Sequence, residues 1–113
     1  FARDSLVGIA LVLHLLAESG KSVTELLQTV PRYHIVKEKI ACPSDRIASV
    51  LRTVRQEFAN FELDTRDGVK VVLPDGWLLV RGSNTEPIVR IVAEARSEAR
   101  ARELVNGLIA RLV

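Results

Sequence analysis

The chain is poor in the residues that most often give a small protein its chemistry. Its 113 residues include one cysteine, two histidines and no methionine. A single cysteine excludes an internal disulfide, and Cys42, beside Pro43, is expected to be a small packed side chain. The cysteine and the histidines lack the spacing of metal ligands, so no metal site is expected. Because there is no methionine, we expect residue 1 to follow other residues in a longer protein.

Long apolar runs and an excess of charge of one sign are also lacking. Sixteen Lys and Arg residues stand against fourteen Asp and Glu, a net charge of +2, and there is no basic block to attract nucleic acid or membranes. The apolar run at residues 6–16 is well short of the roughly 20 residues that span a bilayer. No basic segment precedes it, as one would in a signal peptide. We therefore expect a cytoplasmic protein with no membrane or nucleic-acid partner.

The N-terminal segment is predicted to form two helices. Asp4 is a typical N-cap for a helix over residues 6–16, and Gly20 is a natural stop. Ser22 and Glu25 match a capping box, which indicates the start of a second, short helix.

The first of these helices indicates how the chain is divided. It is apolar on nearly every side, and such a helix needs cover all round, which we expect a neighbouring domain to provide. The segment 31–33, Pro-Arg-Tyr, is the best candidate for a boundary. Residues 1–33 are therefore interpreted as the helical tail of a preceding domain, and residues 34–113 as a domain of their own.

From residue 34 onward the pattern is that of an α+β domain. Asp-Gly pairs at 67–68 and 75–76 are typical of hairpin turns. One helix is expected to begin at Pro43 and another after Ser97. Their apolar stripes are Ile47, Val50, Leu51, Val54 and Phe58, and Leu104, Val105, Leu108, Ile109 and Leu112. Strands are predicted at residues 34–41, 61–65, 69–73, 77–80 and 88–95. These elements predict an antiparallel sheet of four to five strands with two helices on one face.

The segment 81–87, Arg-Gly-Ser-Asn-Thr-Glu-Pro, has the chemistry of a phosphate site. Phosphate is bound by planar guanidinium groups, hydroxyl groups and free backbone N–H groups. Arg81 supplies the guanidinium, and Ser83 and Thr85 supply hydroxyls. Gly82 lets the backbone approach, and Asn84 tolerates a left-handed conformation that would direct N–H groups into a nest. No nucleophile, general base or metal cluster lies beside the segment, so we expect it to bind and not to react.

Two further residues are predicted to support this segment. Glu86 cannot bind phosphate, so we expect it to hold Arg81 or a loop N–H in position, or to bond a hydroxyl of the ligand. Arg90 lies on the polar face of the strand at 88–95. Spacing alone leaves an alternative open, since Ser, Asn, Thr and Pro also form ordinary solvated turns.

A resemblance favours the phosphate site. The segment 81–87, followed by Ile-Val-Arg-Ile-Val-Ala-Glu-Ala at 88–95, resembles the C-terminal signature of the α-D-phosphohexomutases. This family comprises phosphoglucomutases, phosphomannomutases and phosphoglucosamine mutases, and its loop usually reads Arg-Pro-Ser-Gly-Thr-Glu-Pro or a variant with Ser-Asn-Thr. Asp-Gly-Val-Lys at 67–70 and Gly-Trp-Leu-Leu-Val at 76–80 are also similar to the family. The segment 3–33 resembles the end of its third domain, so the resemblance covers nearly the whole chain.

The resemblance implies a four-domain isomerase of carbohydrate metabolism. Such an enzyme interconverts hexose 1-phosphate and hexose 6-phosphate through a phosphoserine in domain 1 and a bisphosphorylated sugar. Mg²⁺ is held by aspartates of domain 2, and a loop of domain 3 reads the sugar. Domain 4, of TATA-binding-protein-like fold, binds the phosphate of the substrate. The partners implied for this chain are therefore a phosphorylated hexose and domains 1–3 of the same parent.

By position, Arg81, Ser83, Asn84 and Thr85 would bind the substrate phosphate. Gly82 replaces the frequent proline, which we expect to loosen the loop. The resemblance assigns no catalytic residue and no metal ligand to this chain, so we expect no turnover from it alone. Two alternatives of other classes remain: a nucleic-acid-binding module on an open sheet, and a protein-interaction module using the 6–16 helix.

Overall fold

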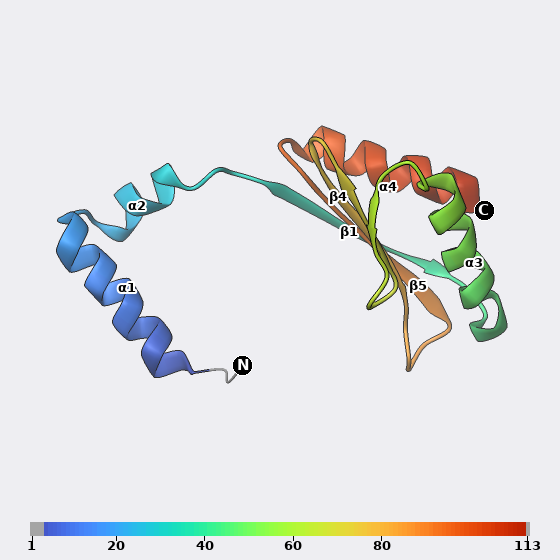
Figure 1. Ribbon diagram of the computed structural model, residues 1–113, viewed down its shortest axis with the longest axis horizontal. Helices are drawn as coiled ribbons and strands as arrows, with labels where there is room; N and C mark the ends of the chain where they lie inside the picture. The colour runs from blue at the N-terminus through green and yellow to red at the C-terminus, as the bar shows by residue number, and fades with distance from the viewer. Residues whose placement is uncertain (1–3, 113) are drawn as a thin grey trace. The chain divides into compact units, whose positions relative to one another are not determined.

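The computed structural model describes residues 4–112, which fall into two compact units divided between Arg32 and Tyr33. The first unit contains two helices, α1 (Ser5–Ser19) and α2 (Val23–Thr29) (Figure 1). Both begin at the predicted caps. Asp4 Oδ1 accepts hydrogen bonds from the N–H groups of Leu6 and Val7, each at 3.0 Å, and Ser22 and Glu25 form the capping box. Gly20, with φ of 63°, ends α1 in the left-handed conformation that favours glycine.

The helices of the first unit have no buried core. No side chain of α1 or α2 is buried, and Leu6 and Leu11 are 78% and 64% exposed. Within residues 4–112 no single helix is long and apolar enough to cross a membrane; α1 and α2, bent by 89°, meet that test only as a pair. The described part of this unit leaves a large apolar surface uncovered.

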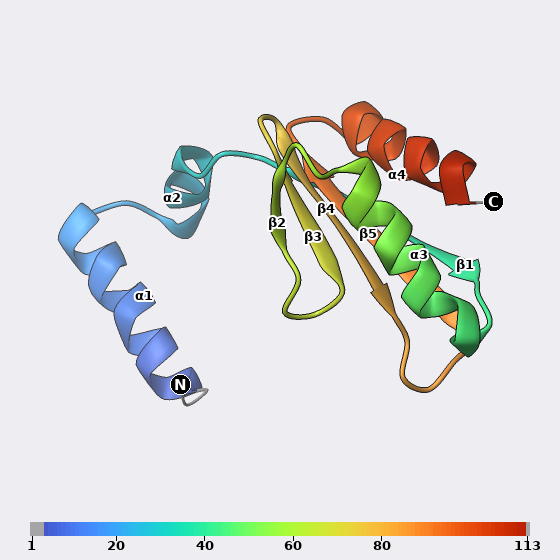
Figure 2. The same ribbon diagram turned by 45° about the vertical axis from the view of Figure 1, so that its right-hand side comes forward.

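The second unit is built on a five-stranded antiparallel sheet (Figures 1 and 2). Its strands are β1 (His34–Ala41), β2 (Glu62–Asp64), β3 (Val69–Leu73), β4 (Gly76–Gly82) and β5 (Ile88–Ala95). They lie in the order β1-β5-β4-β3-β2, so β1 and β2 form opposite edges of the sheet and the connection between them runs from one edge to the other. The α+β fold with an open sheet is confirmed. Two strands differ in length from the prediction, since β2 is shorter than 61–65 and β4 extends beyond 77–80 at both ends.

Two helices, α3 (Ser44–Glu57) and α4 (Glu98–Leu112), cover one face of this sheet (Figure 2). Contacts place α3 over β3 and β4, and α4 over β1 and β5. The predicted stripes provide the packing surface: Val50 and Val54 of α3, and Val105 and Leu108 of α4, are buried. The sheet contributes Val69, Val71, Leu78, Val80, Val89, Ile91, Ala93 and Ala95 to the same core. Cys42 is also buried there, as expected of a small packed side chain.

Strict alternation along β5 leaves a mixed surface on the other face of the sheet. The residues of β5 are alternately half-buried and fully buried, so Arg90 and Glu94 lie on the open face together with Ile88 and Val92. Paired positions on β1 and β4 share that face. The loop between β4 and β5 therefore projects from the end of a sheet that is covered on one side only, which makes it accessible to a ligand.

Candidate functional site

The predicted phosphate segment lies at the hairpin between β4 and β5. Arg81 and Gly82 are the last two residues of β4, and not loop residues as predicted, because their pairing with Arg90 and Val89 continues the ladder. The connection proper is residues 83–87. It is closed by a hydrogen bond in which the Ser83 N–H donates to the carbonyl of Ile88 at 3.0 Å.

The hairpin and its neighbours enclose a cavity of about 380 Å³. The predicted residues Arg81, Gly82, Ser83, Asn84 and Thr85 all line it, together with Arg90 and Asp67. Two guanidinium groups, two hydroxyls and one amide therefore converge on one space. That is a donor set suited to a phosphate group. Glu86 is not among the residues that line the cavity.

Asp67 is the residue of this site that sequence reasoning missed. Arg81 Nη1 donates a hydrogen bond to Asp67 Oδ2 at 2.7 Å, although the two residues are 14 positions apart. On the sequence alone, Asp67 belongs to a predicted hairpin turn and to a segment similar to the family, and no role in the site is assigned to it. The signals for such a role are that similarity and the predicted meander, which brings this turn toward the end of the strand that carries Arg81.

The turn that carries Asp67 packs directly against β4. Gly68 has φ of 75°, and a Cβ built there would lie 2.2 Å from the carbonyl oxygen of Val80 and 2.6 Å from Cβ of Arg81. Only glycine combines that backbone conformation with such a close approach. The turn is therefore held against the backbone of Arg81, which places the carboxylate of Asp67 beside the guanidinium.

Arg90 is held by Glu86. Its Nη2 donates to Glu86 Oε2 at 3.4 Å, a partner different from the Arg81 or loop N–H that we expected for Glu86. The Nε atom of Arg90 is buried and has no hydrogen-bond partner among residues 4–112. A buried donor without a partner costs free energy, so the position of Arg90 is not explained by hydrogen bonding within the described residues alone.

The backbone of the hairpin differs from the expected nest. No described non-glycine residue has a positive φ, so Asn84 is not left-handed. The loop closes instead through short-range bonds, in which the Thr85 N–H donates to Ser83 Oγ at 3.4 Å and the Ile88 N–H to the Glu86 carbonyl at 2.8 Å. These bonds need only ordinary backbone angles. The N–H groups of Asn84 and Glu86 donate no hydrogen bond to any group within residues 4–112.

Position 82 is a glycine because the end of β4 packs closely against α3. A Cβ at this position would lie 2.6 Å from Cγ2 of Ile47, a residue of α3. Because Gly82 is paired within the ladder and touches α3, it does not loosen the hairpin as we expected. It lets the end of β4 approach the helix, and the strand then delivers Arg81 to the cavity on the opposite face.

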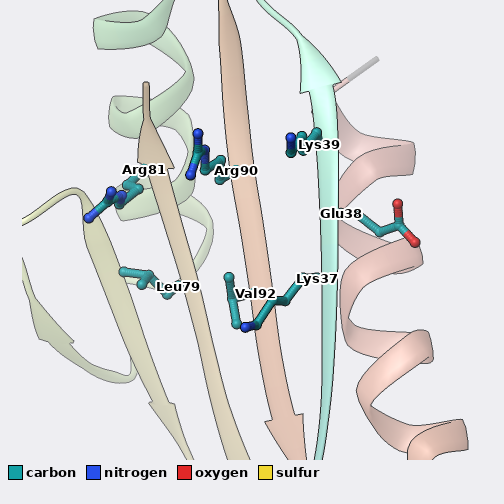
Figure 3. Close-up of a pocket in the computed structure, with 7 residues that line it drawn as sticks. All are labelled: Lys37, Glu38, Lys39, Leu79, Arg81, Arg90 and Val92. Carbon is teal, nitrogen blue, oxygen red and sulfur yellow. The ribbon is translucent and has the colours of Figure 1, made fainter. Parts of the chain in front are cut away.

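A second concavity, of about 310 Å³, adjoins the first on the open face of the sheet (Figure 3). Its cationic residues are Lys37, Lys39, Arg81 and Arg90, and Leu79 and Val92 lie between them. The two concavities share Arg81 and Arg90. The hairpin site therefore continues onto a cationic sheet surface.

A comparison with protein families identifies the second unit. Residues 35–110 match the family model described as "Phosphoglucomutase/phosphomannomutase, C-terminal domain". The chain belongs to this family.

Individual members of the phosphoglucomutase/phosphomannomutase family match nearly the whole chain. It is 47% identical to a probable phosphoglucosamine mutase of Methanopyrus kandleri over 94% of this chain and 24% of that protein. It is 42% identical to a phosphoglucomutase/phosphomannomutase of Thermococcus kodakarensis over 92% of this chain and 23% of that protein. The chain thus spans about a quarter of the length of these relatives.

A solved structure shows the same fold. The crystal structure of a phosphoglucomutase/phosphomannomutase family protein from Burkholderia thailandensis superimposes with a TM-score of 0.57 and 27% identity. The match covers 78% of this chain and 19% of that one. The mutase C-terminal domain is therefore a small part of a longer architecture in this relative too.

Carboxyl groups of the second unit outside the hairpin cavity include two with lowered pKa values. Hydrogen bonds from Arg66 lower the pKa of Asp64, on β2, from 3.8 to about 2. A hydrogen bond from Arg100, at 2.7 Å, also lowers the pKa of Asp75 and ties the β3–β4 turn to α4. Within residues 4–112 no group of three or more His, Cys, Asp or Glu side chains is placed to hold a metal ion.

Proposed function

We propose that residues 34–113 bind the substrate phosphate in a phosphohexomutase, and that residues 1–33 are the end of the preceding domain. The observation that carries this proposal is the hairpin cavity, in which Arg81, Arg90, Ser83, Asn84 and Thr85 converge. The names of the relatives, phosphoglucosamine mutase and phosphoglucomutase/phosphomannomutase, give the substrate class. The uncovered apolar surface of α1 fits a segment that belongs against another domain.

In the parent enzyme, this site would act by orientation. The substrate is a hexose 1-phosphate or 6-phosphate, and the reaction passes through a phosphoserine and a bisphosphorylated sugar. Arg81 presents two N–H donors in a plane that matches two phosphate oxygens. Its bond to Asp67 fixes the guanidinium before the ligand arrives, so less side-chain freedom is lost on binding.

The chemical step is assigned to residues outside this chain. The parent would use Mg²⁺, and the described residues offer no cluster that fits this ion. The hairpin holds one phosphate while the rest of the sugar is presented to the other domains. Because both phosphates of the intermediate must fit the same hairpin in turn, its grip must be reversible. Exposed donors on a loop meet that requirement. Because the chemical step is assigned to other domains, we expect no turnover from the chain alone.

Titration of the labelled 113-residue chain with glucose 6-phosphate, followed by amide NMR, tests the proposal. We expect the amide signals of residues 81–86 to shift and the Arg81→Ala variant to lose these shifts. Arg102→Ala is the matched control, because Arg102 lies on α4 and, within residues 4–112, forms an ion pair with Glu98 alone. Shifts confined to other residues, or none at millimolar ligand, would contradict phosphate binding at the hairpin.

A further inference from the structure

The open face of the sheet carries three cations side by side. Lys39 is paired with Arg90, and Arg90 with Arg81, so the three side chains form a row across β1, β5 and β4 (Figure 3). Like charges directly opposite one another destabilise a sheet. Arg81 and Arg90 have the carboxylates of Asp67 and Glu86 as partners. Lys39 makes no ion pair within the described residues.

Lys37 adds a fourth cation on the same face. It lies beside Val92, its partner in the ladder, and it too makes no ion pair within residues 4–112. The lining carboxylate, Glu38, extends from the other side of β1, away from the row (Figure 3). The concavity of about 310 Å³ therefore has a cationic rim over the apolar side chains of Leu79 and Val92. Its volume lies at the lower end of small-molecule sites, roughly 300–1,000 Å³.

This arrangement has the properties of an anion site in which some of the cationic donors have no partner within the described residues. Lys37 and Lys39 bring ammonium groups that form no ion pair within residues 4–112, and the partly exposed side chain of Arg90 lies beside them. The site is also continuous with the hairpin cavity, because Arg81 and Arg90 line both. A ligand anchored at the hairpin would therefore extend a second anionic group toward Lys37 and Lys39.

We propose that Lys37, Lys39 and Arg90 form a second anion subsite, which takes the other phosphate of a bisphosphorylated sugar while the hairpin holds the first. This inference rests on the proposed function, since it takes the sugar bisphosphate from that reaction. The intermediate must turn around without leaving the protein. A second cationic position on the same rigid sheet retains the released phosphate during that turn.

The competing explanation is that the lysines protect a sheet edge. β1 is an edge strand, and lysine on an edge discourages pairing with other chains. Edge protection requires no ligand. It therefore predicts that the affinity of the protein for a sugar bisphosphate is the same with and without Lys37 and Lys39.

Calorimetric titration of the full chain at constant ionic strength separates the two. Glucose 1,6-bisphosphate is compared with glucose 6-phosphate. A bisphosphate has two equivalent phosphates, so chance alone makes its affinity about twofold higher than that of glucose 6-phosphate. If the second subsite exists, we expect the bisphosphate to bind at least about tenfold more tightly, a difference of about 1.4 kcal/mol. The double variant Lys37→Gln/Lys39→Gln should reduce the preference to the statistical value while glucose 6-phosphate binds as before.

Lys70→Gln is the matched control. Lys70 lies on the same face of the sheet and stacks on Trp77 at 4.7 Å, but it lines neither concavity. Lys70→Gln removes one positive charge where the double variant removes two, so a general electrostatic field predicts that it loses about half as much of the preference, measured as a free energy. A loss of that size in Lys70→Gln would overturn the subsite. An unchanged preference in the lysine double variant would overturn it too, as would no preference in the unmodified chain. If glucose 6-phosphate itself fails to bind at residues 81–86, the proposed function fails instead.

Discussion

Replacing Gly68 by alanine should destabilise the second unit through a single turn. The new Cβ would lie 2.2 Å from the carbonyl oxygen of Val80, and the backbone φ of 75° is left-handed. The left-handed conformation costs about 1–2 kcal/mol, and forcing a methyl group into packed structure costs about 1–3 kcal/mol more. The lower entropy of the unfolded alanine chain offsets up to about 1 kcal/mol. We therefore expect the free energy of unfolding to fall by about 1–5 kcal/mol.

Gly107→Ala provides the matched control for this substitution. Gly107 lies inside α4, and a Cβ there would meet nothing within 4 Å. Alanine favours a helix interior over glycine by about 0.5–1 kcal/mol, so the same change should stabilise the protein at this position. The two glycines thus predict opposite signs for one chemical substitution.

Urea unfolding followed by the fluorescence of Trp77 measures both variants. Trp77 is the one tryptophan of the sequence and lies on β4, so it reports on the second unit. The midpoints should move in opposite directions with an unchanged slope. If Gly68→Ala were as stable as the unmodified protein, the turn would not be held against β4 as described, and the argument for a fixed Asp67 would fail with it.

Three other perturbations test the core, the ionic groups and the site. Leu78→Ala, at a fully buried position, should lower the free energy of unfolding by about 2–5 kcal/mol in the same urea assay. The pKa of Asp64 is lowered by Arg66 to about 2. The Asp64 carboxylate therefore contributes its full stabilisation above about pH 4 and loses it as the pH falls through about 2. In Asp64→Asn, the free energy of unfolding should no longer show this decrease between about pH 4 and pH 2. Asp67→Asn should free the Arg81 guanidinium and raise the Kd for glucose 6-phosphate by about two- to tenfold, from an ordering cost of about 0.5–1.5 kcal/mol; a lower Kd would show that Asp67 competes with the ligand instead.

The sequence was sufficient to predict the layers of the second unit, because its periodicities are regular. The stripe of Val50 and Val54 on α3 packs where a period of 3.6 residues places it, and the buried residues of β5 alternate with its polar ones. The caps at Asp4, Ser22 and Ser97 were readable for the same reason, since each bonds within three residues. Features that depend on local spacing can therefore be predicted from the sequence alone.

Features that depend on contacts between distant segments were not predictable in this way. Arg81 was assigned to a loop because the residues after it are turn formers, but pairing with Arg90 extends β4 through it. Gly82 was interpreted from its flexibility, whereas its small size is required by Ile47, 35 positions earlier. Asn84 was expected to be left-handed from its propensity, yet hydrogen bonds across the hairpin close it with ordinary angles.

The electrostatic repulsion between Arg81 and Arg90 explains why each has a carboxylate partner. Arg81 and Arg90 stand opposite each other, a pairing that would destabilise an isolated sheet. Each is partly compensated by its own carboxylate, Asp67 or Glu86, at a distance that still leaves other guanidinium donors toward the cavity. The carboxylates therefore lower the cost of the empty state without neutralising the attraction for a dianion. A bound phosphate, in contact with both guanidinium groups, would remove the remaining repulsion, so ligand binding and stability of the β4–β5 hairpin should be coupled.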